Sequence, residues 1–373
     1  MRITDIDVLL INSPSRKWTI VQVFTDEGLV GLGEATYSNK EPVVVEAIQH
    51  MKRELLGEDP SKIEFLWHNI YRKSSFSGIW RMAGPVWMSA LSGIDQAHWD
   101  IKGKVAGLPV VDLLGGRFRD SVQVYTHFWG NSSEESAVSA QDSVEKGYTA
   151  LKGSALSSDG YRFDQYLDDG LPKKTAEHFA AVREAVGPDV ELLVDCHGRF
   201  TVANSIRLAR ELEQYNLYAF EDPVPPDDLR AYPKVRQSIS IPVMGSERLN
   251  TKTQFRQLLE LDGVDIAQPD LMYVGGITEV KKIAAISDTF HVPISLHNTK
   301  GPVGIAAAVH LMASIPNVAP LELVTGIEWR DDIIKNPLKV VDGRIQIPNG
   351  PGWGIELNME AVSEYAWTPG DPR

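Results

Sequence analysis

Cysteine is almost absent from this sequence, since Cys196 is the only one among 373 residues. An internal disulfide is therefore excluded, and this usage is typical of proteins of the reducing cytoplasm, where we expect this one to act. Long hydrophobic runs are absent as well, because none approaches the roughly 18 residues of a membrane span. The N-terminal residues alternate like a strand and lack the apolar stretch and cleavage site of a signal peptide. We therefore expect no membrane partner.

Positive charge is also scarce. The chain carries 37 lysine and arginine residues against 50 aspartate and glutamate residues, a formal net charge of −13. No basic run compensates for this excess, which argues against a nucleic-acid partner. With 43% hydrophobic residues the chain can bury a large core, and its length predicts two domains. These properties favour a soluble enzyme.

The first 118 residues combine strands with helices. Residues 18–36 alternate apolar and polar side chains on both sides of an Asp-Glu-Gly turn, which predicts a hairpin. Helical patterns follow over residues 42–57 and 85–105, the second with a continuous apolar face. This segregation of strands and helices predicts an α+β domain over residues 1–118.

From residue 119 to residue 328, short apolar strands alternate with helical patterns. Eight strands are predicted, at residues 122–128, 149–154, 191–197, 217–222, 242–247, 264–270, 292–298 and 319–324. Eight strand–helix units in about 200 residues predict a TIM-type (β/α) barrel.

Two further segments complete the predicted architecture. The tail, residues 329–373, contains a hairpin-like stretch at 340–354 that we expect to return to the first domain and to complete a cap. The stretch between the second barrel strand and its helix is longer than a usual βα loop, so we predict a lid over residues 155–172.

Asp195, Cys196 and His197 stand side by side at the end of a predicted strand. Because side chains alternate along a strand, Asp195 and His197 are predicted to face the barrel mouth and Cys196 the surrounding helices. A zinc site would need further nitrogen or sulfur ligands, and there is no second cysteine. A cysteine nucleophile would need its base on the same side. We therefore predict that Cys196 is a small buried hydrophobic residue.

Three consecutive strands each end in one carboxylate. Asp195, Glu221 and Glu247 are separated by 26 residues each, about one βα unit, so they are predicted to meet at the face of the barrel where active sites lie. Three such carboxylates would repel one another without a cation, and hard oxygen donors suit Mg²⁺. Ordinary acidic residues at strand ends are the alternative, which the regular spacing disfavours. The sequence therefore predicts one Mg²⁺ per active site.

The next strands add an acid–base pair. The sixth ends in Asp270, the seventh in His297, and the eighth carries Glu322. A carboxylate on a neighbouring strand would orient the imidazole and raise its basicity, which predicts a general-base dyad. His127, at the end of the first strand, either lines the pocket or is structural. We interpret the remaining histidines as structural or exposed: His50, His68, His98, His178, His291 and His310.

Four stretches carry a resemblance to a known family: GPVWMSALSGIDQAHWDIKGK (84–104), VDCHGRF (194–200), QPDLMYVGGITE (268–279) and HNTKGPVG (297–304). The chain resembles the mandelate racemase subgroup of the enolase superfamily over nearly its whole length, and within it the D-galactonate dehydratase-like acid-sugar dehydratases. The resemblance implies that Asp195, Glu221 and Glu247 bind Mg²⁺. It also implies a capped barrel and a homo-oligomer.

The same resemblance implies roles for the remaining site residues. His297 with Asp270 would be the general base, His197 the general acid and Glu322 a stabiliser of the intermediate. The base would remove the C2 proton of an aldonate such as galactonate, gluconate or mannonate, and His197 would protonate the departing C3 hydroxyl, giving a 2-keto-3-deoxy acid.

The chain departs from the racemases of this family at the second barrel strand. Racemases carry Lys-x-Lys there, whereas this chain has Lys152 followed by Ser154. A two-base racemase is therefore disfavoured, and Lys152 becomes an electrostatic helper. An acid-sugar epimerase and a non-catalytic relative remain alternatives. Further candidates for substrate binding are His127, Trp80, Arg81 and Arg199.

Overall fold

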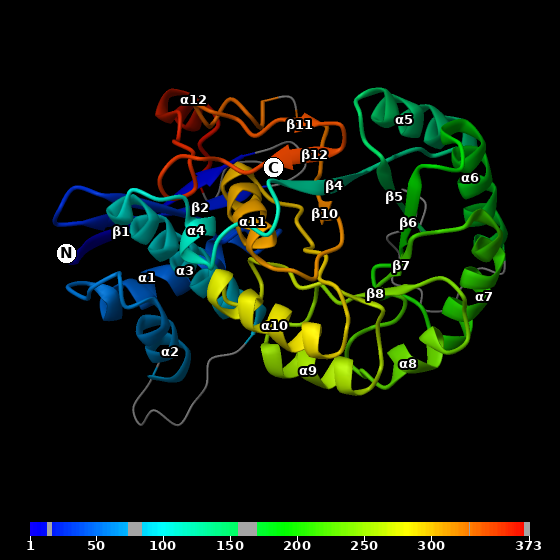
Figure 1. The fold of residues 1–373 in the computed structure, drawn as a ribbon, viewed down its shortest axis with the longest axis horizontal. Coiled ribbons are helices and arrows are strands. Elements are labelled where there is room, and N and C mark those ends of the chain that lie inside the picture. Colours follow the sequence, from blue (N-terminus) through cyan, green and yellow to red (C-terminus); the bar gives the residue numbers. More distant parts are fainter. Residues whose placement is uncertain (13–16, 74–83, 156–169, 328, 369–373) are drawn as a thin grey trace.

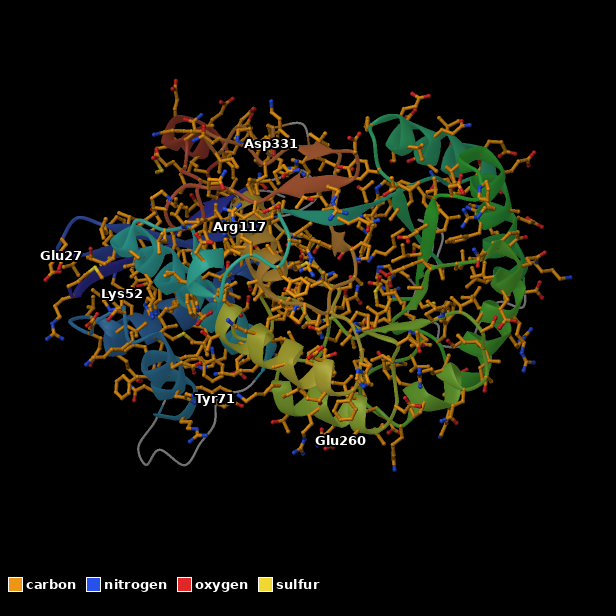
Figure 2. All side chains as sticks on the ribbon, in the orientation of Figure 1. Glu27, Lys52, Tyr71, Arg117, Glu260 and Asp331 are labelled. Atoms are coloured by element: carbon orange, nitrogen blue, oxygen red, sulfur yellow. The ribbon has the colours of Figure 1, made fainter. Side chains whose placement is uncertain are left out.

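The computed structural model describes residues 1–12, 17–73, 84–155, 170–327 and 329–368. Figure 1 shows a smaller α+β unit, coloured blue to cyan, beside a ring of strands and helices built from the middle of the chain. Figure 2 shows charged side chains such as Glu27 and Glu260 at the outer edge of the molecule, where they are exposed. The acidic excess of the sequence therefore includes solvated surface residues.

The smaller unit, which we call the cap, contains an antiparallel sheet in the order β1-β2-β3. Its strands are β1 (Ile3–Ile11), β2 (Trp18–Thr25) and β3 (Val30–Glu34). The predicted hairpin is confirmed as β2 and β3. Apolar side chains of the sheet share one hydrophobic cluster with three helices, which are α1 (Glu41–Leu55), α2 (Ile63–Lys73) and α3 (Pro85–Ala106).

Helix α3 lies between the sheet and the barrel. Its contact with β3 is unusually close, because a Cβ added to Gly33 would lie 1.9 Å from the carbonyl oxygen of Gly93. On its other side Asp95 accepts a hydrogen bond from the Thr278 backbone N–H at 3.1 Å. Burial raises the pKa of Asp95 to about 7, although its hydrogen bonds to Thr278 oppose this rise. The predicted helix is confirmed, and it is buried on its polar face as well.

The barrel is closed by parallel pairing. Its strands run in the order β4-β5-β6-β7-β8-β9, and β10 pairs with β4. They are β4 (Ser121–His127), β5 (Ala150–Ser154), β6 (Glu191–Asp195), β7 (Ala219–Glu221), β8 (Val243–Gly245), β9 (Ile266–Ala267) and β10 (Leu321–Glu322). The predicted seventh strand appears only as isolated bridges, which join Ile294 to Ala267 and Val318, and His297 to Asp270.

Helices surround the strands, and their apolar faces form the main hydrophobic cluster. They are α4 (Val110–Leu113), α5 (Ser133–Glu145), α6 (Leu171–Val186), α7 (Val202–Leu212), α8 (Ala231–Arg236), α9 (Lys252–Glu260), α10 (Ile277–Thr289) and α11 (Pro302–Ser314), with a 3₁₀ turn at Glu213–Tyr215. A separate small cluster fills the barrel interior, from Tyr125, Ala150, Leu193, Ala219, Met244, Ile266 and Ala319.

The tail contacts both the barrel and the cap. Its hairpin, β11 (Val340–Val341) and β12 (Arg344–Gln346), pairs with the start of barrel strand β4 and not with the cap. The parallel strands β10 and β5 pair with β4 only from Val124 onward. Strand β12 pairs with the residues of β4 before that point, 121–123. The residues after the hairpin reach the cap. Trp353 N–H donates to Asp100 Oδ1 at 2.9 Å, and Trp367 N–H, beyond α12 (Met359–Glu364), donates to the Leu10 carbonyl at 2.8 Å.

Several predictions lie outside the described residues. Trp80 and Arg81 fall within 74–83, and most of the predicted lid falls within 156–169. Among the residues described, no helix combines the length and apolar character that crossing a membrane requires.

Candidate active site

A cavity of about 250 Å³ opens at the carboxyl ends of the barrel strands. It is lined by residues of both the barrel and the cap: Ser38, His127, Trp129, Lys152, Gly153, Ser154, Asp195, His197, Glu247, Tyr273, His297, Thr299 and Glu322. A larger hollow of about 480 Å³ lies beside it between α5 and α6 and shares Trp129 and Ser154. The convergent acidic and imidazole groups line the smaller cavity, so we place the candidate active site there.

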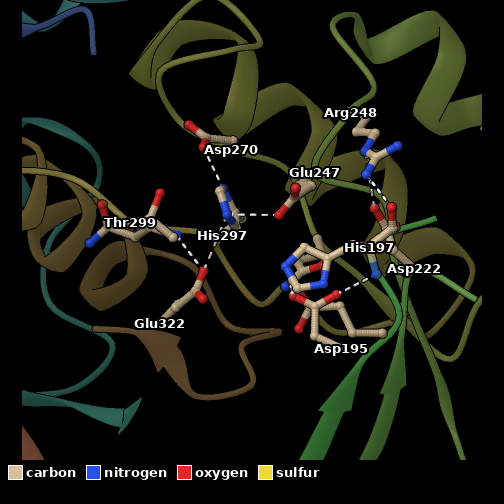
Figure 3. Close-up of polar contacts among 12 residues, drawn as sticks. Asp195, His197, Asp222, Glu247, Arg248, Asp270, His297, Thr299 and Glu322 are labelled. Atoms are coloured by element: carbon tan, nitrogen blue, oxygen red, sulfur yellow. Dashed lines mark hydrogen bonds and ion pairs between the residues drawn. The ribbon is translucent and has the colours of Figure 1, made fainter. Parts of the chain in front are cut away.

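The structure brings His297 and Asp270 together. A backbone bridge joins the two residues, and His297 Nδ1 lies 2.5 Å from Asp270 Oδ2 (Figure 3). Because a carboxylate can only accept, Nδ1 carries the proton, and Nε2 points toward Glu247 Oε2 at 2.7 Å. Burial lowers the pKa of His297, but the Glu247 and Glu322 carboxylates and the bond to Asp270 outweigh it and raise that pKa well above its usual range.

The predicted carboxylates lie on adjacent strands. Asp195 and Glu221 are directly paired across β6 and β7, and Glu247 lies two residues beyond the end of β8. Burial raises the pKa of Glu221 well above its usual range, and the neighbouring Asp195 carboxylate raises it further. The crowding of the three carboxylates in a poorly solvated region therefore disfavours the ionised form of Glu221.

Lys152 stands among these carboxylates. Its Nζ lies 2.8 and 2.9 Å from the two Glu221 oxygens, 2.7 Å from Glu322 Oε1 and 3.5 Å from Asp195 Oδ2. Burial lowers the pKa of Lys152, but Glu221 and Glu322 outweigh this effect and raise it well above its usual range. The lysine is therefore a permanent positive charge inside the cluster.

Glu322 connects several predicted residues. Its Oε1 lies 3.0 Å from His127 Nε2, and its Oε2 accepts the Asn298 backbone N–H at 3.0 Å. Burial raises the pKa of Glu322, yet Lys152 and His297 outweigh burial and hold that pKa well below its usual range. His127 in turn stacks on Trp129, with ring centroids 5.1 Å apart. His127 thus lines the pocket, one of the two alternatives that the sequence left open.

The strand that carries Asp195 is shorter than predicted. It ends at Asp195, and His197 has a left-handed backbone with φ of 53°. The alternation argument therefore does not reach His197. Its ring nevertheless approaches Asp195, with Nε2 3.3 Å from Oδ2, because Asp195 Oδ1 also accepts the His197 backbone N–H at 2.7 Å. The local turn, and not strand phase, brings the ring to the mouth.

Cys196 is fully buried among the side chains between the strands and the helices. Burial raises the pKa of its thiol well above the usual range, and neighbouring carboxylates add to the effect. A thiol in such surroundings is a poor nucleophile. The predicted burial is confirmed. Arg199 is not among the described residues that line the cavity.

Sequence reasoning missed several residues of the site. Tyr273 and Thr299 line the cavity, and Lys300 Nζ lies 3.0 Å from Asp270 Oδ2 and 2.8 Å from the Tyr273 hydroxyl. Lys300 follows His297 in one of the motifs used above, so its closeness in sequence was an available signal. Ser38 had none, because it belongs to the cap and more than 250 residues separate it from His297.

Comparison with known proteins identifies the family. Residues 11–115 match the N-terminal domain of the mandelate racemase / muconate lactonizing enzyme family, and residues 135–362 match the enolase C-terminal domain-like family. The chain belongs to the enolase superfamily, in this subgroup. Members of the superfamily typically use a divalent metal.

Relatives with assigned activities span nearly the whole chain. D-Xylonate dehydratase of Haloferax volcanii is 34% identical over 371 residues, covering 97% of this chain and 88% of the relative. D-Galactonate dehydratase of Pectobacterium atrosepticum is 34% identical over 93% of this chain and 91% of its own. The solved structure of 3,6-anhydro-D-galactonate cycloisomerase from Zobellia galactanivorans matches with a TM-score of 0.88 at 32% identity, covering 99% of this chain and 100% of that one.

The charge balance of the site fits a divalent cation. Five carboxylates gather there, and Lys152 and Lys300 form ion pairs with members of this group. The five are Asp195, Glu221, Glu247, Asp270 and Glu322. Hard oxygen donors with excess negative charge suit a divalent ion. In the described conformation no three His, Cys, Asp or Glu side chains of the described residues form a metal-ligand cluster, and the Lys152 ammonium instead contacts Glu221 and Asp195.

Proposed function

We propose that this protein is a Mg²⁺-dependent dehydratase of an acid sugar. The observation that carries the proposal is that two imidazoles, His297 and His197, line one cavity together with the carboxylate cluster. Elimination of water from an aldonate requires a base at C2 and an acid at the C3 hydroxyl, and two separate imidazoles suit this division.

His297 takes the C2 proton in this proposal. Asp270 holds the Nδ1 proton, so Nε2 is the atom that exchanges a proton with the substrate. In the described conformation Nε2 pairs with Glu247 Oε2 at 2.7 Å, so it must leave that carboxylate and lose its proton before it can act as the base. Asp270 fixes the tautomer and the ring orientation, so the base is aligned before the substrate arrives.

His197 supplies the second proton. Hydroxide is a poor leaving group, so the C3 hydroxyl departs only when it is protonated. His197 Nε2 lies beside Asp195, on the side of the cavity opposite the Asp270 dyad in Figure 3. The enol product then tautomerises to a 2-keto-3-deoxy acid.

Asp195, Glu221 and Glu247 are the proposed ligands of Mg²⁺. When bound, the ion would stabilise the negative charge that develops on the substrate carboxylate after C2 is deprotonated. Lys152 and Glu322 shape the charge around this site, and His127 with Trp129 forms one wall. Trp80, Arg81 and Arg199 remain proposed substrate contacts on the resemblance alone, as does the homo-oligomer.

A screen of acid sugars tests the proposal. Purified protein with Mg²⁺ is incubated with C5 and C6 aldonates, including xylonate, galactonate, gluconate and mannonate, and 2-keto-3-deoxy product is measured. Product that appears only with Mg²⁺ and is lost after substitution of His297 supports the proposal. A change in stereochemistry at C2 without any 2-keto acid would instead establish an epimerase. Absence of both product and C2 hydrogen exchange on every aldonate would favour a non-catalytic relative.

A further inference from the structure

We propose that Glu34 of the cap and Lys300 of the barrel are positioning residues for the Asp270–His297 dyad, so that the cap aligns the base. The inference rests on the proposed role of His297. It follows from a set of contacts that joins β3 of the cap to the segment directly after His297.

Glu34 is fully buried at the end of β3. Its Oε1 accepts the Gly301 backbone N–H at 2.7 Å and the Thr36 hydroxyl at 2.6 Å, and its Oε2 accepts the Gly304 backbone N–H at 2.8 Å. The Gln96 side chain of α3 brackets the Glu34 backbone with two further hydrogen bonds, at 3.2 and 3.0 Å. The carboxylate is therefore held rigidly from the cap.

These bonds cap helix α11 from another domain. The helix has no side-chain cap of its own and no acidic residue in its first turn, and nearly all its residues are buried. Buried N–H groups at a helix start must find acceptors, and Glu34 supplies them. The cap approaches so closely that a Cβ on Gly301 would lie 2.9 Å from the Trp18 ring, and one on Gly304 would lie 3.0 Å from Glu34 Oε2.

Lys300 continues the connection into the dyad. Its side chain is fully buried, and its Nζ lies 3.0 Å from Asp270 Oδ2, the oxygen that also binds His297. The other Asp270 oxygen accepts the Met272 backbone N–H at 2.7 Å. The residue after Lys300 is Gly301, which Glu34 anchors. The segment from His297 to Gly301, which we call the base loop, is thus held at both ends. The His297 N–H donates to the Pro269 carbonyl at 3.2 Å, and the Gly301 N–H donates to Glu34 of the cap.

Substitution of Glu34 tests this assignment. In E34Q the amide offers one acceptor oxygen in place of two, so a backbone N–H of Gly301 or Gly304 loses its partner. We expect kcat to fall by about 10- to 100-fold, because small displacements of a catalytic group are costly, while KM changes by less than about twofold. E34D, which keeps both oxygens, should recover part of kcat. If E34Q does not fold, E34D provides the test in its place.

Asp100 provides a matched control. It is a buried cap carboxylate that accepts two backbone N–H groups, from Leu32 at 2.8 Å and Trp353 at 2.9 Å, and pairs with Lys104, but it does not touch the base loop. D100N should lower the melting temperature without changing kcat. K300M should lower kcat, and the effects of E34Q and K300M should be less than additive because both act through Asp270.

A second readout needs no turnover. The Nδ1–H proton resonance of His297 in histidine-labelled protein, assigned with H297N, should move in E34Q and K300M and stay in place in D100N. If kcat and this resonance are unchanged in E34D, E34Q and K300M, the proposal is overturned. If the resonance moves but the wild-type protein forms no 2-keto acid, the positioning role stands and the proposed dehydration fails.

Discussion

The two sides of the active-site cavity hold their histidines differently. On one side the His297 side chain is 8% exposed, with Asp270 on one ring nitrogen and Glu247 on the other. On the other side the His197 side chain is 28% exposed, and its Nε2 lies 3.3 Å from Asp195 Oδ2. The more buried ring, with a carboxylate at each nitrogen, is therefore the one proposed to act as the base.

The His197 side is held through its backbone. Arg248 donates to the His197 carbonyl (Figure 3). The Gly198 N–H donates to the Asp222 carbonyl at 2.7 Å. Tyr232 in turn donates to Asp222 Oδ1 at 3.1 Å. The His297 side is fixed by buried side chains and the His197 side by a left-handed turn, which leaves the second ring closer to solvent. Five predictions test this contrast, from the largest effect to the smallest.

Replacement of His297 should abolish both proposed proton transfers. The amide of H297N cannot accept a proton at neutral pH, so C2 hydrogen exchange in D₂O and dehydration should both fall by about 10²–10⁴-fold or more. Proton NMR follows exchange and product together. H291N is a suitable control, because exposed His291 has a φ of 56° that asparagine tolerates. Exchange that survives here but vanishes in H197N would require the two roles to be swapped.

Replacement of Glu221 should affect both sides equally, because it lies in the carboxylate cluster between them. In E221Q we expect weaker Mg²⁺ binding by calorimetry and loss of activity, with the fold retained by circular dichroism. The exposed Glu260 gives the control variant E260Q. Unchanged Mg²⁺ affinity in E221Q would remove Glu221 from the proposed ligand set.

Replacement of His197 should separate the two steps. Asparagine accepts the left-handed backbone at this position, so H197N removes the ring with little strain. Dehydration should fall by about 10²–10⁴-fold, whereas C2 exchange should persist, provided that the base proton equilibrates with solvent. Equal loss of both activities would contradict a separate acid.

Replacement of Arg248 should have a smaller effect confined to the His197 side. R248M removes the donor to the His197 carbonyl, and a lost charged hydrogen bond corresponds to roughly a tenfold change. We expect dehydration to slow by about this factor while C2 exchange is unchanged. A comparable loss of exchange would show that the two sides are not independent.

Replacement of Cys196 should have the smallest effect. C196A removes a buried sulfur from the layer between strands and helices, at a cost of about 1 kcal/mol in the free energy of unfolding. Denaturant unfolding measures this cost, and kcat should equal that of the wild-type protein. A large drop in kcat without unfolding would place the thiol in the site.

Local sequence patterns were sufficient for the barrel strands that carry the site. The regular positions of Asp195, Glu221 and Glu247 and the neighbouring positions of Asp270 and His297 follow from the period of βα units, so their closeness was predictable. The same reasoning extended β6 by two residues too many, because a strand pattern does not reveal where a left-handed turn begins.

The sequence by itself determined the barrel, the acidic cluster and the pairing of Asp270 with His297, because each depends on the spacing of successive βα units. The tertiary structure alone decided that β12 pairs with β4, that Ser38 lines the cavity and that Glu34 caps helix α11. These contacts join residues hundreds of positions apart. They depend on which backbone groups remain unpaired once the domains pack, and no local periodicity encodes that.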